Sequence, residues 1–256
     1  MFIISKILPI TSCSAHRISL TLFLKMVYNR RKWRLAMKGL SKNILIVLVI
    51  IVVSGSLFIT MANLVGSGKI ESFDLPIIRL VQGLEAPWLT VLFKTFTWIG
   101  SAKAVVPITI IVCFLLFFVY KHRQQAFVFA FSIVGTIALN ELLKGHFKRA
   151  RPEIYRIMDA GGYSFPSGHT MMAFSLYGMI TYILWRNIKT VGGRVALLSF
   201  ASFMAFMIAT SRIYLGVHYP SDVVGGIAAS TICVTISAII YSACQHPRKN
   251  NETEST

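Results

Sequence analysis

The hydrophobic positions of the chain form six long apolar runs, which short polar segments separate. Each run approaches the roughly 20 residues that an α-helix needs to cross the hydrocarbon core of a bilayer. The predicted spans lie at about residues 44–65, 104–120, 126–143, 168–185, 195–211 and 223–244. This pattern predicts an all-α protein, an integral membrane bundle of six transmembrane helices.

The segment 66–103, between the first two runs, has a different pattern. It mixes charged residues with Leu, Ile and Phe, and it carries Trp88 and Trp98. Pro76 and Pro87 interrupt it. Charged and aromatic residues in one short segment are typical of helices that lie in the membrane interface. We therefore expect short interfacial helices between spans one and two.

The two ends of the chain differ from its apolar middle. A basic cluster, Arg30–Lys42, follows an apolar stretch, which is the reverse of the order in a secretory signal. Met26 and Met37 are alternative starts of translation, and we expect residues 1–36 to be poorly ordered and unnecessary for the chemistry. The expected division is an N-terminal segment of residues 1–43, a six-span domain of residues 44–244 and a polar tail of residues 245–256.

The composition agrees with a membrane protein and narrows the range of partners. Hydrophobic residues make up 55% of the 256 positions and charged residues 14%. The mean hydropathy of +0.67 is too high for a soluble globular domain. The net charge of +17 is dispersed between the apolar spans. Dispersed Lys and Arg are typical of cytoplasmic loops, so we expect membrane lipids as partners and no nucleic acid.

The distribution of Lys and Arg predicts the orientation in the membrane. The cluster Arg30–Lys42 precedes span one, so the N-terminus is expected in the cytoplasm. The basic loops after spans two and four, and the tail with Arg248 and Lys249, then fall on the same side. The loop between spans three and four breaks the rule, because its basic residues from Lys144 to Arg156 would lie outside. This exception indicates that something on the external face needs positive charge.

Polar residues from three separated stretches of sequence meet at the external ends of the predicted spans. Lys144 and Arg151 follow span three, Ser167, Gly168 and His169 open span four, Arg212 closes span five, and His218 and Asp222 open span six. Charged groups at membrane depth are costly and usually functional. The sequence therefore predicts one site at the extracytoplasmic face.

The residue types on this face suit the binding of a phosphate group. Lys144, Arg151 and Arg212 are cations that can hold phosphate oxygens, and each arginine can do so with two hydrogen bonds. Ser167 and Gly168 lie where span four begins, and backbone N–H groups at a helix start attract anions. These five residues are the candidate phosphate-binding residues.

Two histidines and one acid supply candidate catalytic groups. His218 is a candidate nucleophile at phosphorus, and Asp222, four residues later, can orient its imidazole. His169 can protonate the leaving oxygen and then deprotonate the water that cleaves the phosphoenzyme. The acids outside the interfacial segment and the tail are too few to surround a magnesium ion. We therefore expect no metal and no cofactor, and the four cysteines show no metal-ligand spacing either.

Three motifs, in this order, resemble the signature of the type 2 phosphatidic acid phosphatase (PAP2) superfamily. The motifs are Lys144-x6-Arg151-Pro152, Pro166-Ser167-Gly168-His169 and Ser211-Arg212-x5-His218-x3-Asp222. The resemblance covers about residues 44–244 and implies a helical core, metal-independent dephosphorylation and a phosphohistidine intermediate. It implies His218 as the nucleophile, His169 as the general acid and base, and Asp222 as a partner. The five remaining candidates are implied as phosphate binders.

The resemblance and the predicted orientation together define the expected function. We expect a metal-independent lipid phosphatase in a bacterial plasma membrane, with both termini in the cytoplasm and the site outside. Among the substrates of the family, an outward-facing site favours undecaprenyl diphosphate. Phosphatidate, phosphatidylglycerol phosphate and diacylglycerol pyrophosphate come next. A lipid phosphotransferase with the same site and a non-catalytic lipid-binding protein remain as alternatives, and the oligomeric state stays open.

Other polar residues near the motifs have simpler interpretations. Glu141 is expected to be a local partner of Lys144 or Lys148. The secondary candidates for contacts with the substrate headgroup are Arg149, Arg156, Asp159 and Tyr163.

Overall fold

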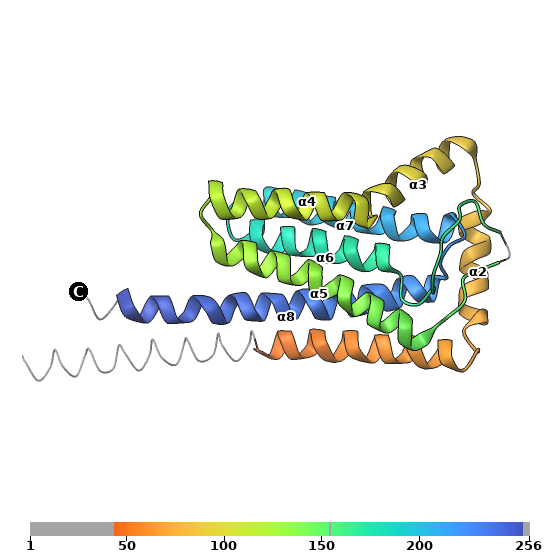
Figure 1. Ribbon diagram of the computed structural model, residues 1–256, viewed down its shortest axis with the longest axis horizontal. Coiled ribbons are helices and arrows are strands. Elements are labelled where there is room, and N and C mark those ends of the chain that lie inside the picture. The colour runs from red at the N-terminus through yellow and green to blue at the C-terminus, as the bar shows by residue number, and fades with distance from the viewer. Residues whose placement is uncertain (1–43, 154, 253–256) are drawn as a thin grey trace, which may run out of the picture. The chain divides into compact units, whose positions relative to one another are not determined.

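The computed structural model describes residues 44–153 and 155–252 of the protein, and all regular elements in these ranges are helices (Figure 1). The helix Ile44–Gly66 is followed by α2 (Glu71–Gln82), α3 (Pro87–Ile99), α4 (Ala102–Phe114) with its π-helical extension η1 (Leu115–Val119), α5 (Arg123–Phe147), α6 (Gly168–Trp185), α7 (Val191–Tyr214) and α8 (Pro220–Glu252). The chain divides into two units after Val49, and the bundle and the site belong to the second. The expectations for residues 1–36 and for the basic cluster lie outside the described residues.

Within residues 44–153 and 155–252, five helices are long and apolar enough, by length and composition, to cross a membrane: Ile44–Gly66, Ala102–Val119, Arg123–Phe147, Val191–Tyr214 and Pro220–Ala243. The sixth predicted span, α6, has the predicted bounds but is not one of the five. Its first half carries His169, Thr170 and Ser175, which lower its hydropathy. The predicted helical membrane bundle, with short helices between spans one and two, is therefore confirmed. The count of six apolar spans is not fully reproduced.

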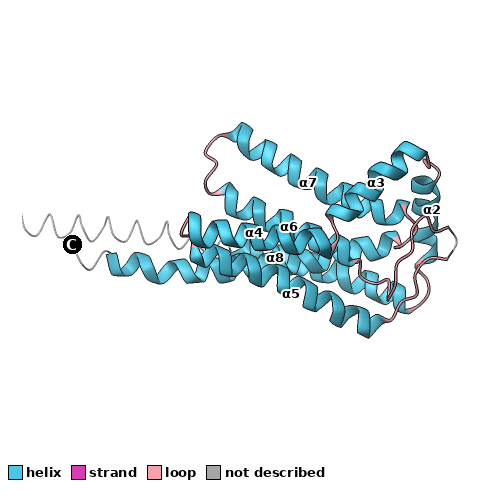
Figure 2. Ribbon diagram, turned by 45° about the horizontal axis from the view of Figure 1, so that its top comes forward, coloured by secondary structure: helices cyan, strands magenta, loops and turns pink. Residues whose placement is uncertain are grey.

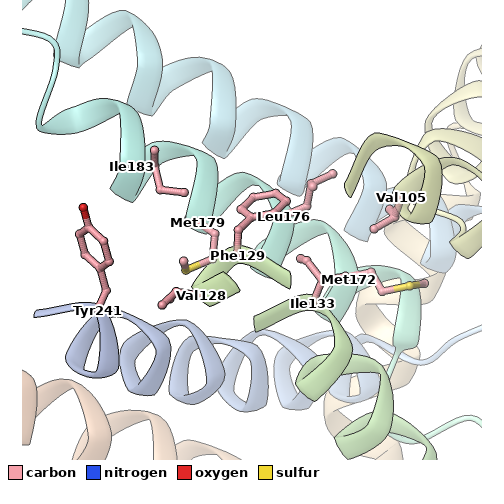
Figure 3. Packing of buried hydrophobic residues seen from close by; sticks show 9 residues of the cluster. All are labelled: Val105, Val128, Phe129, Ile133, Met172, Leu176, Met179, Ile183 and Tyr241. Carbon is pink, nitrogen blue, oxygen red and sulfur yellow. The ribbon is translucent and has the colours of Figure 1, made fainter. Parts of the chain in front are cut away.

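The central position of α6 explains its more polar sequence. This helix packs against α4, α5, α7 and α8. Its Leu176, Met179 and Ile183 lie in the main hydrophobic core together with Phe129 of α5 and Tyr241 of α8 (Figure 3). A helix that is enclosed by other helices faces protein instead of lipid, so it tolerates polar side chains that find protein partners.

The segment between spans one and two folds into α2 and α3. Pro87 occupies the first turn of α3, where its missing N–H leaves no hydrogen bond unmade. Pro76, however, lies inside α2 and does not end it, which corrects the expected interruption. Asp74 and Ile78 are buried on either side of this proline and hold the helix in place despite one lost hydrogen bond. The helix α2 runs across the end of the bundle at which α8 begins (Figure 1, Figure 2).

The loop between α5 and α6 lies at the same end of the bundle (Figure 2). The backbone N–H of Ile157 donates to the carbonyl of Leu215 at 3.1 Å, which ties the loop to the segment between α7 and α8. Gly216 permits this approach, because a β-carbon there would overlap the carbonyl oxygen of Tyr155. The loop is thereby held beside the residues that precede α8.

Candidate active site

The structure brings the eight predicted site residues together at the end of the bundle that α2 crosses. They come from the last turn of α5 (Lys144), the loop after it (Arg151), the start of α6 (Ser167, Gly168, His169), the last turn of α7 (Arg212) and the start of α8 (His218, Asp222). Electrostatic interactions join His169 to Arg212, His218, Lys144 and Arg151. These groups converge because α5 and α7 end where α6 and α8 begin.

A buried pair, His218 and Asp222, forms the centre of the site. His218 lies just before α8, as predicted, because Pro220 begins that helix. Asp222, in the first turn, accepts the backbone N–H of Tyr219 at 2.8 Å and so helps to cap the helix. Its Oδ2 also lies 3.3 Å from Nδ1 of His218, and both side chains are buried. Asp222 therefore acts both as a helix cap and as the histidine's partner.

The surroundings of His218 determine its protonation state and its tautomer. Burial lowers the pKa of His218 to about 4, although Asp222 opposes the shift, so the imidazole is neutral near pH 7. Nε2 lies 3.1 Å from Nη1 of Arg151, and a guanidinium can only donate, so Nε2 accepts. Nδ1 then carries the proton and donates it to Asp222. This leaves an unprotonated Nε2, which is the form that a nucleophile requires.

The carboxylate of Asp222 has partners on both of its oxygens. Oδ2 accepts the hydroxyl of Ser164 in addition to the histidine, and Oδ1 accepts Nη1 of Arg149 at 2.7 Å. A buried carboxylate with donors on both oxygens has no freedom to rotate. The orientation of His218 therefore depends on residues outside the predicted set.

Arg151 is held in place by backbone carbonyls. Its Nη2 donates to Gly161 at 2.8 Å, its Nε to Gly162 at 3.1 Å, and its Nη1 to Val217 at 2.8 Å. Burial lowers the pKa of Arg151 and Asp222 raises it, and a guanidinium stays ionised at neutral pH. The fixed guanidinium also contacts His218, so a phosphate group at Nε2 would meet a positive charge.

Arg212 is a buried cation that has a hydrogen-bond donor to spare. Its side chain is 2% exposed, and Nη1 donates to the hydroxyl of Thr97 on α3. Within the described residues, Nε of Arg212 has no hydrogen-bond partner. A buried guanidinium with an unpaired N–H is costly unless an anion binds it. Arg212 therefore indicates an anion-binding position at the end of α7.

The start of α6 offers fewer phosphate donors than the sequence predicts. The backbone N–H of Ser167 already donates to the carbonyl of Asp222 at 3.0 Å, which corrects its expected role as a free backbone donor. Its hydroxyl accepts from Thr170 at 3.0 Å and keeps its own proton to donate. Gly168 begins α6 close to Asn140, whose Oδ1 would lie 2.7 Å from a β-carbon at this position. The Ser167 hydroxyl and the backbone of Gly168 remain as donors.

Lys144 and His169 complete the predicted set. Nζ of Lys144 lies 4.0 Å from Oε1 of Glu141, which confirms the expected local pair. The exposed fractions of the two side chains are 19% and 72%, so this pair is at the surface and holds Lys144 only weakly. His169, in the first turn of α6, is half-buried. Both residues are thus less constrained than the buried groups around Asp222.

Two further residues, Arg149 and Asp74, belong to the site in roles that the sequence did not predict. Arg149, a secondary candidate for headgroup contact, instead donates to Asp222 at 2.7 Å and to Asp74 at 2.8 Å. Its place two residues before Arg151 in the first motif was the available signal. No signal in the sequence pointed to Asp74, because its contact with Arg149 spans 75 positions and leaves no local pattern.

The donors and acceptors of the site suit an anion. Among the residues that the structure describes, no three His, Cys, Asp or Glu side chains form a group that could hold a metal ion. Asp74 and Asp222 both have Arg149 as their counterion. A neutral histidine beside several cations can attack a tetrahedral anion and stabilise the charge that develops.

Comparisons with known proteins find a family and several relatives. The PAP2 superfamily model matches residues 125–245, which include all eight predicted site residues. The chain is 28% identical over 170 residues to phosphatidylglycerophosphatase B of Bacillus subtilis, covering 66% of this chain and 83% of that protein. It is 26% identical over 174 residues to an undecaprenyl-diphosphatase of Sulfolobus acidocaldarius, covering 64% of this chain and 76% of that protein.

A solved structure shares the fold. The crystal structure of a transmembrane PAP2-type phosphatidylglycerolphosphate phosphatase from Bacillus subtilis superposes with a TM-score of 0.69 at 24% sequence identity. The match covers 76% of this chain and 96% of that chain. The helical bundle described above is therefore the fold of a known membrane protein.

Proposed function

We propose that the protein is a multi-pass membrane phosphatase of the PAP2 superfamily, whose model matches residues 125–245, and that it hydrolyses lipid phosphates through a phosphohistidine on His218. The observation that carries the proposal is the neutral His218, whose Nδ1 is paired with Asp222 while Nε2 faces Arg151. Arg212, a buried cation whose Nε finds no partner among the residues that the structure describes, supports the proposal because it offers a position for the phosphate.

The proposed first step transfers the phosphoryl group to His218. The lone pair of Nε2 attacks phosphorus, and the bond from phosphorus to the lipid oxygen breaks. His169, which the bound phosphate anion keeps protonated, gives its proton to that oxygen. The imidazole becomes positively charged, and Asp222 stabilises that charge through the Nδ1 proton. Nη1 of Arg151 occupies the hydrogen-bonding direction of Nε2 in the free protein. As the substrate binds, this N–H must pass from Nε2 to a phosphate oxygen, while Nε and Nη2 keep their carbonyl partners.

The proposed second step hydrolyses the phosphohistidine without a metal ion. Water attacks phosphorus, His169 takes the proton of this water, and the phosphorus–nitrogen bond breaks so that its electron pair returns to Nε2. The groups proposed to hold the phosphate oxygens in both steps are Lys144, Arg151, Arg212, the hydroxyl of Ser167 and the backbone of Gly168. The products are inorganic phosphate and a lipid with one phosphate fewer.

We propose an isoprenyl diphosphate, such as undecaprenyl diphosphate, as the lipid. The orientation that the basic residues predict supports this choice, since it gives cytoplasmic termini and an extracytoplasmic site in a plasma membrane. The similarity to an undecaprenyl-diphosphatase supports it as well. The similarity to phosphatidylglycerophosphatase B favours a second candidate, a glycerolipid phosphate such as phosphatidylglycerophosphate. Both lipids present a terminal phosphate on an apolar chain, so the same two steps apply.

Phosphate release by the purified protein in detergent tests this function. The wild-type protein should release inorganic phosphate from undecaprenyl diphosphate and phosphatidylglycerophosphate, with EDTA present and without an added acceptor. The ratio of the kcat/KM values then ranks the two lipids. His218→Ala should abolish release because it removes the nucleophile, whereas His146→Ala, an exposed histidine of α5, should not. Turnover by a folded His218→Ala protein would contradict the mechanism, and release only with an acceptor would indicate a phosphotransferase.

A further inference from the structure

A chain of ion pairs, buried at both ends and half-buried at Arg149, runs from α2 to the His218–Asp222 pair. Asp74, in the first turn of α2, accepts Nη2 of Arg149 at 2.8 Å. Nη1 of the same arginine donates to Oδ1 of Asp222 at 2.7 Å. Oδ2 of Asp222 in turn lies 3.3 Å from Nδ1 of His218. The chain therefore joins α2, the loop after α5 and the start of α8, three elements that are distant in sequence.

Further contacts lock the guanidinium of Arg149 in one plane. Ser221 accepts Nη1 of Arg149 at 2.8 Å and donates its hydroxyl to Oδ2 of Asp74 at 2.7 Å. The backbone N–H of Ser221 donates to the other oxygen of Asp74 at 2.8 Å. The guanidinium also lies over the ring of Tyr219, with 3.9 Å between its carbon and the ring centroid. Arg149 thus has no freedom to turn away from Asp222.

Arg149 differs from the candidate phosphate-binding cations because its terminal nitrogens already have protein partners. Both of its terminal nitrogens are committed to carboxylates and to Ser221. Arg212, by contrast, keeps an unpaired donor within the described residues. Lys144 has a weak surface partner in Glu141. The charge of Arg149 therefore acts on Asp222 and not on the phosphate.

We propose that Asp74 and Arg149 are positioning residues, which fix the carboxylate of Asp222 so that it presents Nε2 of His218 to phosphorus. This inference rests on the proposed function, because it assigns the attack to His218. A planar, two-pronged donor that bridges two carboxylates sets an orientation as well as a charge. In metal sites, the groups that orient the metal ligands typically contribute about ten- to a hundred-fold to activity, and we expect a similar contribution from groups that orient Asp222. The interfacial helix α2 thereby contributes to the chemistry through a single acid.

Kinetics of conservative variants in the full-length protein test this proposal. Asp74→Asn keeps the shape of the side chain and removes its negative charge. Arg149→Lys keeps the positive charge but replaces the two terminal nitrogens of the guanidinium with one. We expect kcat to fall about ten-fold in the first and ten- to a hundred-fold in the second. KM and the inhibition constant of inorganic phosphate should stay within about two-fold, because the phosphate-binding cations are untouched. The double variant should be little worse than Arg149→Lys alone, because Asp74 acts through Arg149.

Matched controls come from the same helix. Glu71→Gln removes an exposed charge from the first turn of α2, and Arg79→Lys changes an exposed arginine in its last turn. Both should leave kcat unchanged. Thermal unfolding in detergent shows whether each variant is folded. If Asp74→Asn or Arg149→Lys fails to fold, Ser221→Ala decides instead, since it removes only one link between the two residues.

The outcomes separate this proposal from the proposed function. Folded Asp74→Asn and Arg149→Lys proteins with wild-type kcat would overturn the positioning role. So would a parallel loss of kcat and phosphate affinity, which indicates a general disturbance of the site, or a Ser221→Ala protein with unchanged kcat where that variant decides. A wild-type protein that releases no phosphate, or a folded His218→Ala protein that still does, refutes the proposed function itself.

Discussion

Nη1 of Arg151 lies 3.1 Å from Nε2 of His218, the atom that is proposed to attack phosphorus. Both side chains are buried, so water weakens this interaction little. The guanidinium fixes the tautomer of His218 and also lowers its pKa. The pH range of the enzyme and its response to the loss of Arg151 both depend on this contact.

The acid limb of the pH profile is expected to have its midpoint well below the pKa of an ordinary histidine. Because burial lowers the pKa of His218 from 6.5 to about 4, the imidazole stays neutral, and therefore nucleophilic, down to that pH. A plot of kcat/KM for phosphate release against pH should fall on the acid side with a midpoint near 4. A midpoint near 6.5 would show that the group which must be neutral is not the buried His218.

Removal of the Arg151 charge should move this limb upward. A nearby positive charge disfavours the imidazolium, so Arg151 contributes to the low pKa of His218. Arg151→Gln keeps a donor but loses the charge, so the midpoint of the acid limb should rise, and kcat/KM should fall about a hundred-fold or more. Arg79→Gln, which changes an exposed arginine of α2, is the control. An acid limb that stays in place would contradict the electrostatic role of Arg151.

Replacement of Arg212 should weaken phosphate binding more than loss of the Thr97 hydroxyl on α3, which accepts a hydrogen bond from Arg212. Arg212→Lys keeps the charge but removes the unpaired Nε donor, so the inhibition constant of inorganic phosphate should rise about ten-fold. Thr97→Val removes only the hydroxyl that holds Nη1, and its effect should be smaller. Inhibition of phosphate release by added phosphate measures both effects. Unchanged inhibition in Arg212→Lys would exclude Arg212 as a phosphate ligand.

Gly216 should be essential for stability. Its φ of +70° lies in the left-handed region, and a β-carbon would overlap the backbone carbonyl of Tyr155. Gly216→Ala should therefore destabilise the protein by about 2 kcal/mol or more. Gly192→Ala is the matched control, because Gly192 lies in α7 with open space around it and alanine favours helices. Equal midpoints of thermal unfolding in detergent for the two variants would contradict this reading of the loop.

The elements that carry a strong local pattern were predicted well. The predicted bounds of α6, residues 168–185, agree with the structure, and the five other apolar runs correspond to the five helices that can cross a membrane. The placement of His218 before α8 followed from Pro220 alone. Pro76 was misjudged because buried neighbours on both sides hold α2 in place, which propensity does not record.

The helical spans and the meeting of their polar ends follow from local properties of the chain, because length and hydropathy act locally and alternating spans return to the same face. The sequence also supplied the three motifs with their cations and histidines. Two features emerge once the chain has folded: Arg149 pairs with Asp222 and Asp74, and the carbonyl of Asp222 accepts the backbone N–H of Ser167. These are contacts between distant segments, and they depend on which buried donor finds which acceptor once the helices have packed.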